Sequence, residues 1–267
     1  YIDKKGDVRT VKEHTAWDRT EFNSDNAMME FKKLGFSNQL FPFPKVSSLV
    51  KHMCYLADTQ NSVILDFFSG SATTAHAVMQ LNAEDGGNRK FIMVQLPEQT
   101  DEKSEAYKLG YKNICEIGKE RIRRAGKKIK EEAGLQGQNL DTGFRVLKLD
   151  ESNMADVYYT PADTPIQTTL AFDALVDNIR EGRTAEDLLF QVLPECNLPL
   201  SSKIETREIH GKKVFVVNDG YLMACFDKDI NEAVITAIAK EKPYYFVMCD
   251  RSMETDNVAD NFEQIFE

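Results

Sequence analysis

The chain has 267 residues, of which 42% are hydrophobic and 28% charged, and its formal net charge is −10 at pH 7. This composition is ordinary for a soluble globular protein, and no run of about 18 apolar residues is present that would predict a membrane span. The negative net charge argues against a general coat protein for nucleic acid. The sequence begins at Tyr1 without an initiator methionine or a signal-peptide core, so we expect a fragment of a longer protein.

The distribution of charges and cysteines narrows the class further. Residues 1–150 carry 23 Lys and Arg against 21 Asp and Glu, whereas residues 151–267 carry 10 against 22. The second part is therefore a poor candidate for contact with a phosphate backbone. The five cysteines are scattered and form no Cys-x-x-Cys pair, which predicts a reducing, cytoplasmic location and no metal site.

The first predicted elements are a polar connecting segment, an extended strap and a helix. Residues 1–30 are polar and look like a connection to structure outside this chain. Two prolines forbid a helix across residues 41–44 and favour an extended run. A helix is predicted over residues 46–57, with Ser47 or Ser48 as its N-cap.

The next stretch has the pattern of a strand, a tight loop and a helix. Residues 63–65 are apolar and predict a short buried strand that Asp66 ends, and residues 67–72 form a turn. From Thr73 apolar residues recur every three to four positions, which predicts a helix. Unpaired backbone N–H groups and the positive end of the helix dipole would then meet a ligand. A purely structural strand-to-helix turn is the alternative.

A second buried strand is predicted over residues 90–96, parallel to the first, with Gln95 at its carboxyl end. An amphipathic helix follows over residues 114–133, and alternation over residues 144–149 predicts a third strand. The polar face of that helix carries six cationic residues: Lys119, Arg121, Arg123, Arg124, Lys127 and Lys128. We favour a solvated surface for this face, with contact to DNA phosphates as the alternative.

From about residue 151 the pattern changes to a small α+β module without an obvious catalytic cluster. Two helices are predicted first, one over residues 166–180 and one that begins after a cap at Thr184. Three antiparallel strands, a helix and a last strand follow over residues 203–209, 214–217, 221–226, 231–240 and 244–249.

Three short motifs lie before residue 100. They are Phe41-Pro42-Phe43-Pro44-Lys45, Asp66-Phe67-Phe68-Ser69-Gly70-Ser71-Ala72-Thr73-Thr74 and Val94-Gln95-Leu96-Pro97-Glu98. Together they resemble the motifs of S-adenosylmethionine-dependent DNA amino-methyltransferases. More narrowly, roughly residues 30–267 resemble the modification subunit of type III restriction–modification systems, which methylates adenine at N6. The C-terminal runs that share this resemblance are Glu186-Asp187-Leu188-Leu189-Phe190, Asn218-Asp219-Gly220 and Cys249-Asp250-Arg251-Ser252.

The resemblance implies a site for S-adenosylmethionine on the loop after the first strand. The loop residues concerned are Asp66, Phe67, Phe68, Ser69, Gly70 and Ser71. Asp66 would pair with the ammonium group of the cofactor. Backbone amides near Gly70 and the hydroxyls of Thr73 and Thr74 would meet its carboxylate.

The resemblance also implies roles for the strap and for the end of the second strand. Phe41, Pro42 and Lys45 match the strap that closes over the cofactor. The second strand of the family normally ends in a carboxylate that binds both ribose hydroxyls, and here Gln95 stands in that place. Either Gln95 binds the ribose or Glu98 reaches back to do so, and a surface amide without a cofactor role is the further alternative for Gln95.

Two features depart from the family pattern. Ala72 replaces the usual third glycine of the loop, and the catalytic motif Asp-Pro-Pro-Tyr is absent from the chain. No catalytic residue is therefore assigned here, and that motif and the DNA-reading domain are expected upstream of the cofactor loop. For His76 we favour a surface or packing role over chemistry.

The sequence thus predicts an α/β fold. A connecting segment of residues 1–30 precedes a partial Rossmann-like methyltransferase sheet in residues 31–150, and residues 151–267 form a smaller C-terminal α+β module. The resemblance implies that the parent protein is a DNA adenine-N6 methyltransferase. It would bind DNA through parts outside this chain, associate with a restriction subunit and form a homodimer, without membrane contact. The alternative is a subunit-assembly module with no catalysis of its own.

Overall fold

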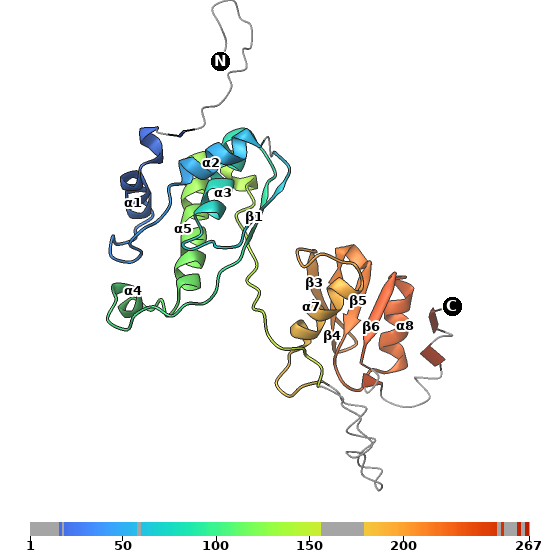
Figure 1. The fold of residues 1–267 in the computed structure, drawn as a ribbon. Coiled ribbons are helices and arrows are strands. Elements are labelled where there is room, and N and C mark those ends of the chain that lie inside the picture. Colours follow the sequence, from blue (N-terminus) through green and yellow to red (C-terminus); the bar gives the residue numbers. More distant parts are fainter. Residues whose placement is uncertain are drawn as a thin grey trace, which may run out of the picture. The chain divides into compact units, whose positions relative to one another are not determined.

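A computed structural model of the protein describes residues 16–17, 19–57, 60–155, 179–249, 252–253, 261–262 and 265–266. The chain divides into two compact units, Tyr1–Phe144 and Arg145–Glu267, which are described separately (Figure 1). No helix in the described parts combines the length and the apolar character needed to cross a membrane.

The first unit is built on two short parallel strands joined by a buried helix. Its elements are η1 (Thr20–Phe22), α1 (Ser24–Lys33), α2 (Ser47–Leu56), β1 (Val63–Asp66), α3 (Thr73–Asp85), β2 (Lys90–Met93), α4 (Glu105–Lys108), α5 (Ile114–Ala133) and η2 (Gln136–Asn139). β1 and β2 pair in parallel, from Val63 opposite Lys90 to Asp66 opposite Met93. The predicted order of strand, loop, helix and strand and the parallel pairing are therefore confirmed. The second strand is shorter than predicted, because it ends at Met93, and neither strand is buried.

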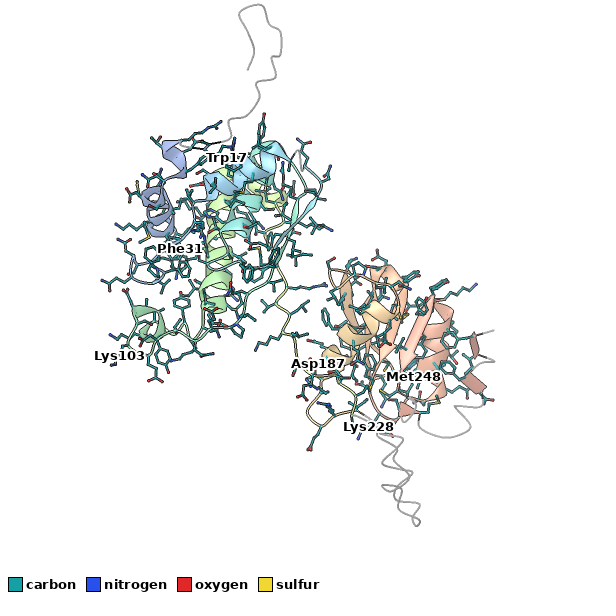
Figure 2. The ribbon with its side chains drawn as sticks, viewed as in Figure 1. Trp17, Phe31, Lys103, Asp187, Lys228 and Met248 are labelled. Carbon is teal, nitrogen blue, oxygen red and sulfur yellow. The ribbon has the colours of Figure 1, made fainter. Side chains whose placement is uncertain are left out.

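Helix α3 is the centre of the first unit. It packs against α2, α5 and β2, and almost every residue of its first two turns is buried. Phe31 of α1, labelled in Figure 2, stacks on Phe36 with 4.5 Å between ring centroids. The two-stranded sheet is less buried than α3, since Val63 and Ile92 remain 57% and 52% exposed. One face of the two-stranded sheet is therefore open in the described structure.

The second unit is a mixed four-stranded sheet with the strand order β3-β4-β5-β6. Its elements are α7 (Ala185–Glu195), β3 (Ile204–Ile209), β4 (Lys212–Val217), η3 (Asn218–Gly220), β5 (Leu222–Cys225), α8 (Glu232–Lys240) and β6 (Tyr245–Met248). β3, β4 and β5 are antiparallel, as the sequence predicts, whereas β6 runs parallel to β5 after the crossover through α8.

The two central strands of this sheet, β4 and β5, are covered on both faces. Alternate residues of β4 and β5, such as Val214 and Met223, pack with Ile235 of α8. Their neighbours, such as Phe215, pack with Leu189 of α7. β4 and β5 are almost completely buried for this reason, and a mixed α/β fold results.

One prediction from the sequence is wrong, and another is not tested by the described residues. Residues 144–149 form no strand, because the alternating residues find no partner strand and Leu147 and Leu149 are exposed. The predicted helix over residues 166–180 falls almost wholly outside the described residues.

Candidate functional site

The loop between β1 and α3 is shaped by two residues with left-handed backbone conformation. Gly70 has φ +52°, and Ala72, directly before α3, has φ 60° and ψ 42°. The backbone N–H of Ala72 donates to the carbonyl of Ser69 at 2.7 Å, which closes the turn. The turn thus begins at the carboxyl end of β1 and leads directly into the first residue of α3.

The same loop is tied to the end of β2. The backbone N–H of Gly70 donates to Oε1 of Gln95 at 2.7 Å, and that of Ser69 donates to the carbonyl of Val94 at 3.2 Å. Nε2 of Gln95 in turn donates to the carbonyl of Leu96 at 3.3 Å. Both ends of the Gln95 amide therefore have partners inside the protein, while Glu98 is exposed.

Asp66 lies at the point where the loop leaves the sheet. Its Oδ2 accepts a hydrogen bond from the Thr74 hydroxyl at 2.6 Å, and its Oδ1 accepts one from the Phe68 amide at 3.2 Å. The residue is half-buried. Since a carboxylate offers about four acceptor positions, Asp66 keeps capacity for a cationic ligand.

A pocket of about 420 Å³ opens beside Asp66. Its lining residues come from α2 and the turn after it, from β1 and from the loop: Val50, Met53, Cys54, Ala57, Ile64, Leu65, Asp66, Phe67, Phe68 and Thr74. The volume lies within the range of small-molecule sites, and a mostly apolar wall with a few polar groups is typical of them. Burial raises the pKa of the Cys54 thiol, so this cysteine contributes an uncharged side chain to the pocket wall.

The strap, residues 41–45, lies against the loop. A Cβ atom placed on Gly70 would lie 3.8 Å from Cζ of Phe41, an ordinary van der Waals distance, so the Phe41 ring lies directly beside the loop. The carbonyl of Lys45 accepts a hydrogen bond from the Thr73 hydroxyl at 3.2 Å. Pro42 and the Lys45 side chain are exposed beside these contacts.

The hydroxyls of Thr73, Thr74 and Ser47 all have hydrogen-bond partners within the protein. Thr73 and Thr74 are 6% and 7% exposed, and both hydroxyls already bond to protein atoms. Ser47 does not cap α2, whose N-cap is Val46 without a side-chain hydrogen bond. Instead the amide and hydroxyl of Ser47 donate to the Glu30 carboxylate at 3.0 and 2.8 Å.

Arg121 is the residue that sequence reasoning missed. The charge pattern predicts an exposed position for it on the cationic face of α5, but it is 0% exposed. Its Nη1 donates to the hydroxyls of Ser71 and Thr73 at 3.0 and 2.6 Å. The available signal was its spacing, because Arg121 stands four residues from both Ile117 and Ala125 and shares their apolar face.

His76 lies beside this arginine and is 5% exposed. Its Nδ1 is 3.5 Å from Nη2 of Arg121. Burial, with a further contribution from the Arg121 charge, lowers the pKa of His76 to about 3. The imidazole is therefore neutral at pH 7, and since arginine only donates, Nδ1 is the acceptor. The packing role favoured for His76 agrees with this burial.

Comparisons with known proteins give matches to DNA methylases and to subunits of restriction–modification enzymes. Residues 2–126 match the family model described as DNA methylase (N6_N4_Mtase). The chain is also 42% identical over 129 residues to the Mod subunit of the type III restriction-modification enzyme StyLTI of Salmonella typhimurium, an alignment covering 48% of this chain and 19% of that subunit.

Two further relatives are of the same kind. The EcoPI Mod subunit of Escherichia phage P1 is 34% identical over 178 residues, covering 64% of this chain and 27% of the relative. The EcoP15I Mod subunit of Escherichia coli is 37% identical over 159 residues, an alignment covering 56% of this chain and 23% of that subunit. The chain is thus a relative of type III modification subunits, and it spans about a fifth to a quarter of the length of these proteins.

Proposed function

We propose that the first unit is the cofactor-binding part of a DNA adenine-N6 methyltransferase of the type III modification kind. The observation that carries this proposal is the pocket of about 420 Å³ beside Asp66, with the strap packed against the loop that borders it. S-adenosylmethionine fits such a site in chemistry, because its ammonium group requires an anion and its apolar parts require an apolar wall. When bound, the cofactor supplies a methyl group on a sulfonium centre.

Each residue of the proposed site has a binding task. The Asp66 carboxylate binds the ammonium group, and Phe67 and Phe68, which are 62% and 81% exposed, cover the apolar parts of the ligand. The first turn of α3 favours the carboxylate through its dipole, since Ala72 has no side chain that caps it. Glu98 is the better candidate for the ribose hydroxyls, because the amide of Gln95 is engaged by Gly70 and Leu96.

The other residues predicted for the site stabilise the loop and do not bind the cofactor through their side chains. Ser69, Gly70 and Ser71 shape the turn, and the buried hydroxyls of Thr73 and Thr74 fix Lys45 and Asp66. Phe41, Pro42 and Lys45 close the site as the strap. These roles assign the chain to cofactor binding and leave the chemistry to residues outside it.

We further propose that β1 and β2 are two strands of a larger Rossmann-like sheet. Parallel sheets are normally buried on both faces, yet apolar residues of this sheet are about half exposed. The exposed residues are Val63, Leu65 and Ile92 within the strands, and Val94 and Leu96 directly after β2. Segments of the parent protein outside this chain would cover this face and supply the Asp-Pro-Pro-Tyr motif.

In the whole protein we propose direct methyl transfer to the N6 amine of an adenine that is flipped out of DNA. Positioning of the base against the methyl group would supply most of the acceleration. The restriction subunit and a second modification subunit are proposed partners, and the cytoplasm is the proposed location. The similarity to Mod subunits supports this reading over a pure assembly module.

Calorimetric titration of S-adenosylmethionine into the wild-type chain and into Asp66→Ala tests the cofactor site. We expect binding that Asp66→Ala weakens by tenfold or more. Asp85→Ala is the matched control, because Asp85 lies at the opposite end of α3 and pairs with Arg89. Equal affinities for wild type and Asp66→Ala would refute the site, as would absence of binding even after the upstream part of the parent is restored.

A further inference from the structure

Arg121 connects the loop of the candidate cofactor site with the strap that packs against this loop. Nη1 holds the loop through the hydroxyls of Ser71 and Thr73, at 3.0 and 2.6 Å. Nη2 lies 3.6 Å from Oε2 of Glu30, a residue of α1. Phe31, labelled in Figure 2, lies next to Glu30 in the chain, and its ring centroid is 5.4 Å from the guanidinium carbon.

Glu30 extends this connection to the strap. Its two carboxylate oxygens accept hydrogen bonds from the amide and the hydroxyl of Ser47, two residues after Lys45. The carbonyl of Lys45 in turn receives the Thr73 hydroxyl. A closed network of polar contacts therefore links the loop, the Arg121 guanidinium, the Glu30 carboxylate and the strap.

Burial of the Arg121 charge in this network costs free energy of folding. Arg121 is completely buried, its nearest carboxylate is 3.6 Å away, and no acceptor among the described residues reaches its Nε. A buried charge of this kind often stabilises a fold less than an apolar side chain of similar volume would. Its position between loop and strap explains the arginine better than a contribution to stability does.

Helix α5 approaches the loop closely on the turn before Arg121. A Cβ atom added to Gly118 would lie 3.3 Å from the carbonyl oxygen of Gly70 and 3.5 Å from Cβ of Ala72. Glycine at this position lets the left-handed turn lie directly on the helix. Gly118 and Arg121 are three residues apart and so lie on the same side of α5.

We propose that Arg121 and Glu30 are positioning residues that lock the strap and the loop in the geometry that receives the cofactor. This inference rests on the proposed function, since the cofactor site is its object. Neither residue touches the pocket itself, so both act through Ser47, Ser71 and Thr73.

Arg121→Lys and Glu30→Gln in the 267-residue chain test the proposal, with Arg89→Lys as the matched control. Lysine keeps the charge but cannot bridge two hydroxyls and a carboxylate as a planar fork does. Arg89 is also buried and paired, at 2.7 Å with Asp85, but it precedes β2 and lies at the other edge of the sheet. Calorimetry should show S-adenosylmethionine binding at least tenfold weaker for Arg121→Lys and Glu30→Gln, and within twofold of wild type for Arg89→Lys.

Amide hydrogen exchange without ligand separates this proposal from the proposed function. The amides of Gly70, Ala72 and His76 are bonded within the loop region, and they should exchange at least tenfold faster in Arg121→Lys than in Arg89→Lys. If no cofactor binds even after the upstream part of the parent is restored, the proposed function fails, and the exchange rates alone decide the positioning role. Unchanged exchange and unchanged affinity in Arg121→Lys, or equal effects of Arg89→Lys, would overturn it.

If Arg121→Lys does not fold, a second pair of variants tests whether α5 supports the loop geometry. Gly118→Ala pushes a methyl group against the loop, whereas Gly126→Ala makes the same change on the same helix against Thr142, whose Cβ would be 2.8 Å away. We expect at least tenfold weaker binding and faster exchange of the loop amides in Gly118→Ala only. Equal values for the two variants would count against α5 as the support of the loop.

Discussion

The buried imidazole of His76 makes the stability of the first unit depend on pH. In the folded chain the pKa of His76 is about 3, against 6.5 for a free histidine. Below pH 6.5 the unfolded chain therefore binds a proton that the folded chain does not, and the free energy of unfolding falls as the pH falls. At pH 5 the loss relative to pH 7 works out at about 2 kcal/mol.

Urea unfolding at pH 7 and pH 5, followed by tryptophan fluorescence, measures this loss. Trp17 is the only tryptophan of the chain and lies in the first unit, where its ring contacts His52 at 5.2 Å, so its signal reports on that unit alone. The window stops at pH 5 because carboxylates begin to titrate below it. A loss of about 2 kcal/mol is a large share of the 5–15 kcal/mol typical of domains.

His76→Gln supplies the decisive comparison. Glutamine stays neutral and offers Oε1 to Arg121, so most of the difference between pH 7 and pH 5 should disappear in this variant. His52→Gln is the control, because it removes the histidine that touches Trp17 while leaving His76 in place. A His76→Gln variant that loses as much stability as the wild type between the two pH values would refute the reasoning.

Two further predictions concern the second unit, followed by far-UV circular dichroism during urea unfolding. Thr184→Ala removes the capping box that Thr184 forms with Asp187, labelled in Figure 2, and should lower the free energy of unfolding by about 1 kcal/mol. Leu193→Ala empties a fully buried position against the sheet and should cost about 2–5 kcal/mol, while the Trp17 midpoint of the first unit stays unchanged.

The elements around the loop were predictable because each had a local signal. The apolar run of β1 and the helical spacing after Thr73 needed no information from elsewhere in the chain. Residues 144–149 carried an equally good alternating pattern, yet they form no strand because a strand requires a partner. Arg145 donates instead to the carbonyl oxygens of Leu200 and Ser202 in the second unit.

The polar contacts of the site were less predictable, because they join residues far apart in sequence. Gly70 and Gln95 are 25 residues apart, and Arg121 and Thr73 are 48 apart. A charge pattern on one helix says nothing about such distant hydroxyls, so Arg121 was grouped with its solvated neighbours. The resemblance supplied the site residues, whereas only the structure showed that Thr73 faces the strap and Arg121.

Three contributions to the free energy of unfolding decide whether alanine or glycine at position 72 makes the first unit more stable. Its left-handed conformation costs about 1–2 kcal/mol that glycine would avoid. Glycine would lose about 0.4–1 kcal/mol through the greater freedom of the unfolded chain and about 0.8 kcal/mol through the missing buried methyl group. The methyl group of Ala72 is only 2% exposed and faces Gly118, whose missing side chain leaves room for it.

These terms nearly cancel, so Ala72→Gly should change the free energy of unfolding of the first unit by less than about 1 kcal/mol. Ala72→Val should instead destabilise it by more than about 2 kcal/mol, because a β-branched residue is a true outlier in this conformation and no space remains beside the helix. Urea unfolding monitored at Trp17 measures both. Equal stability of the valine and glycine variants would mean that the turn does not keep the left-handed geometry that joins β1 to α3.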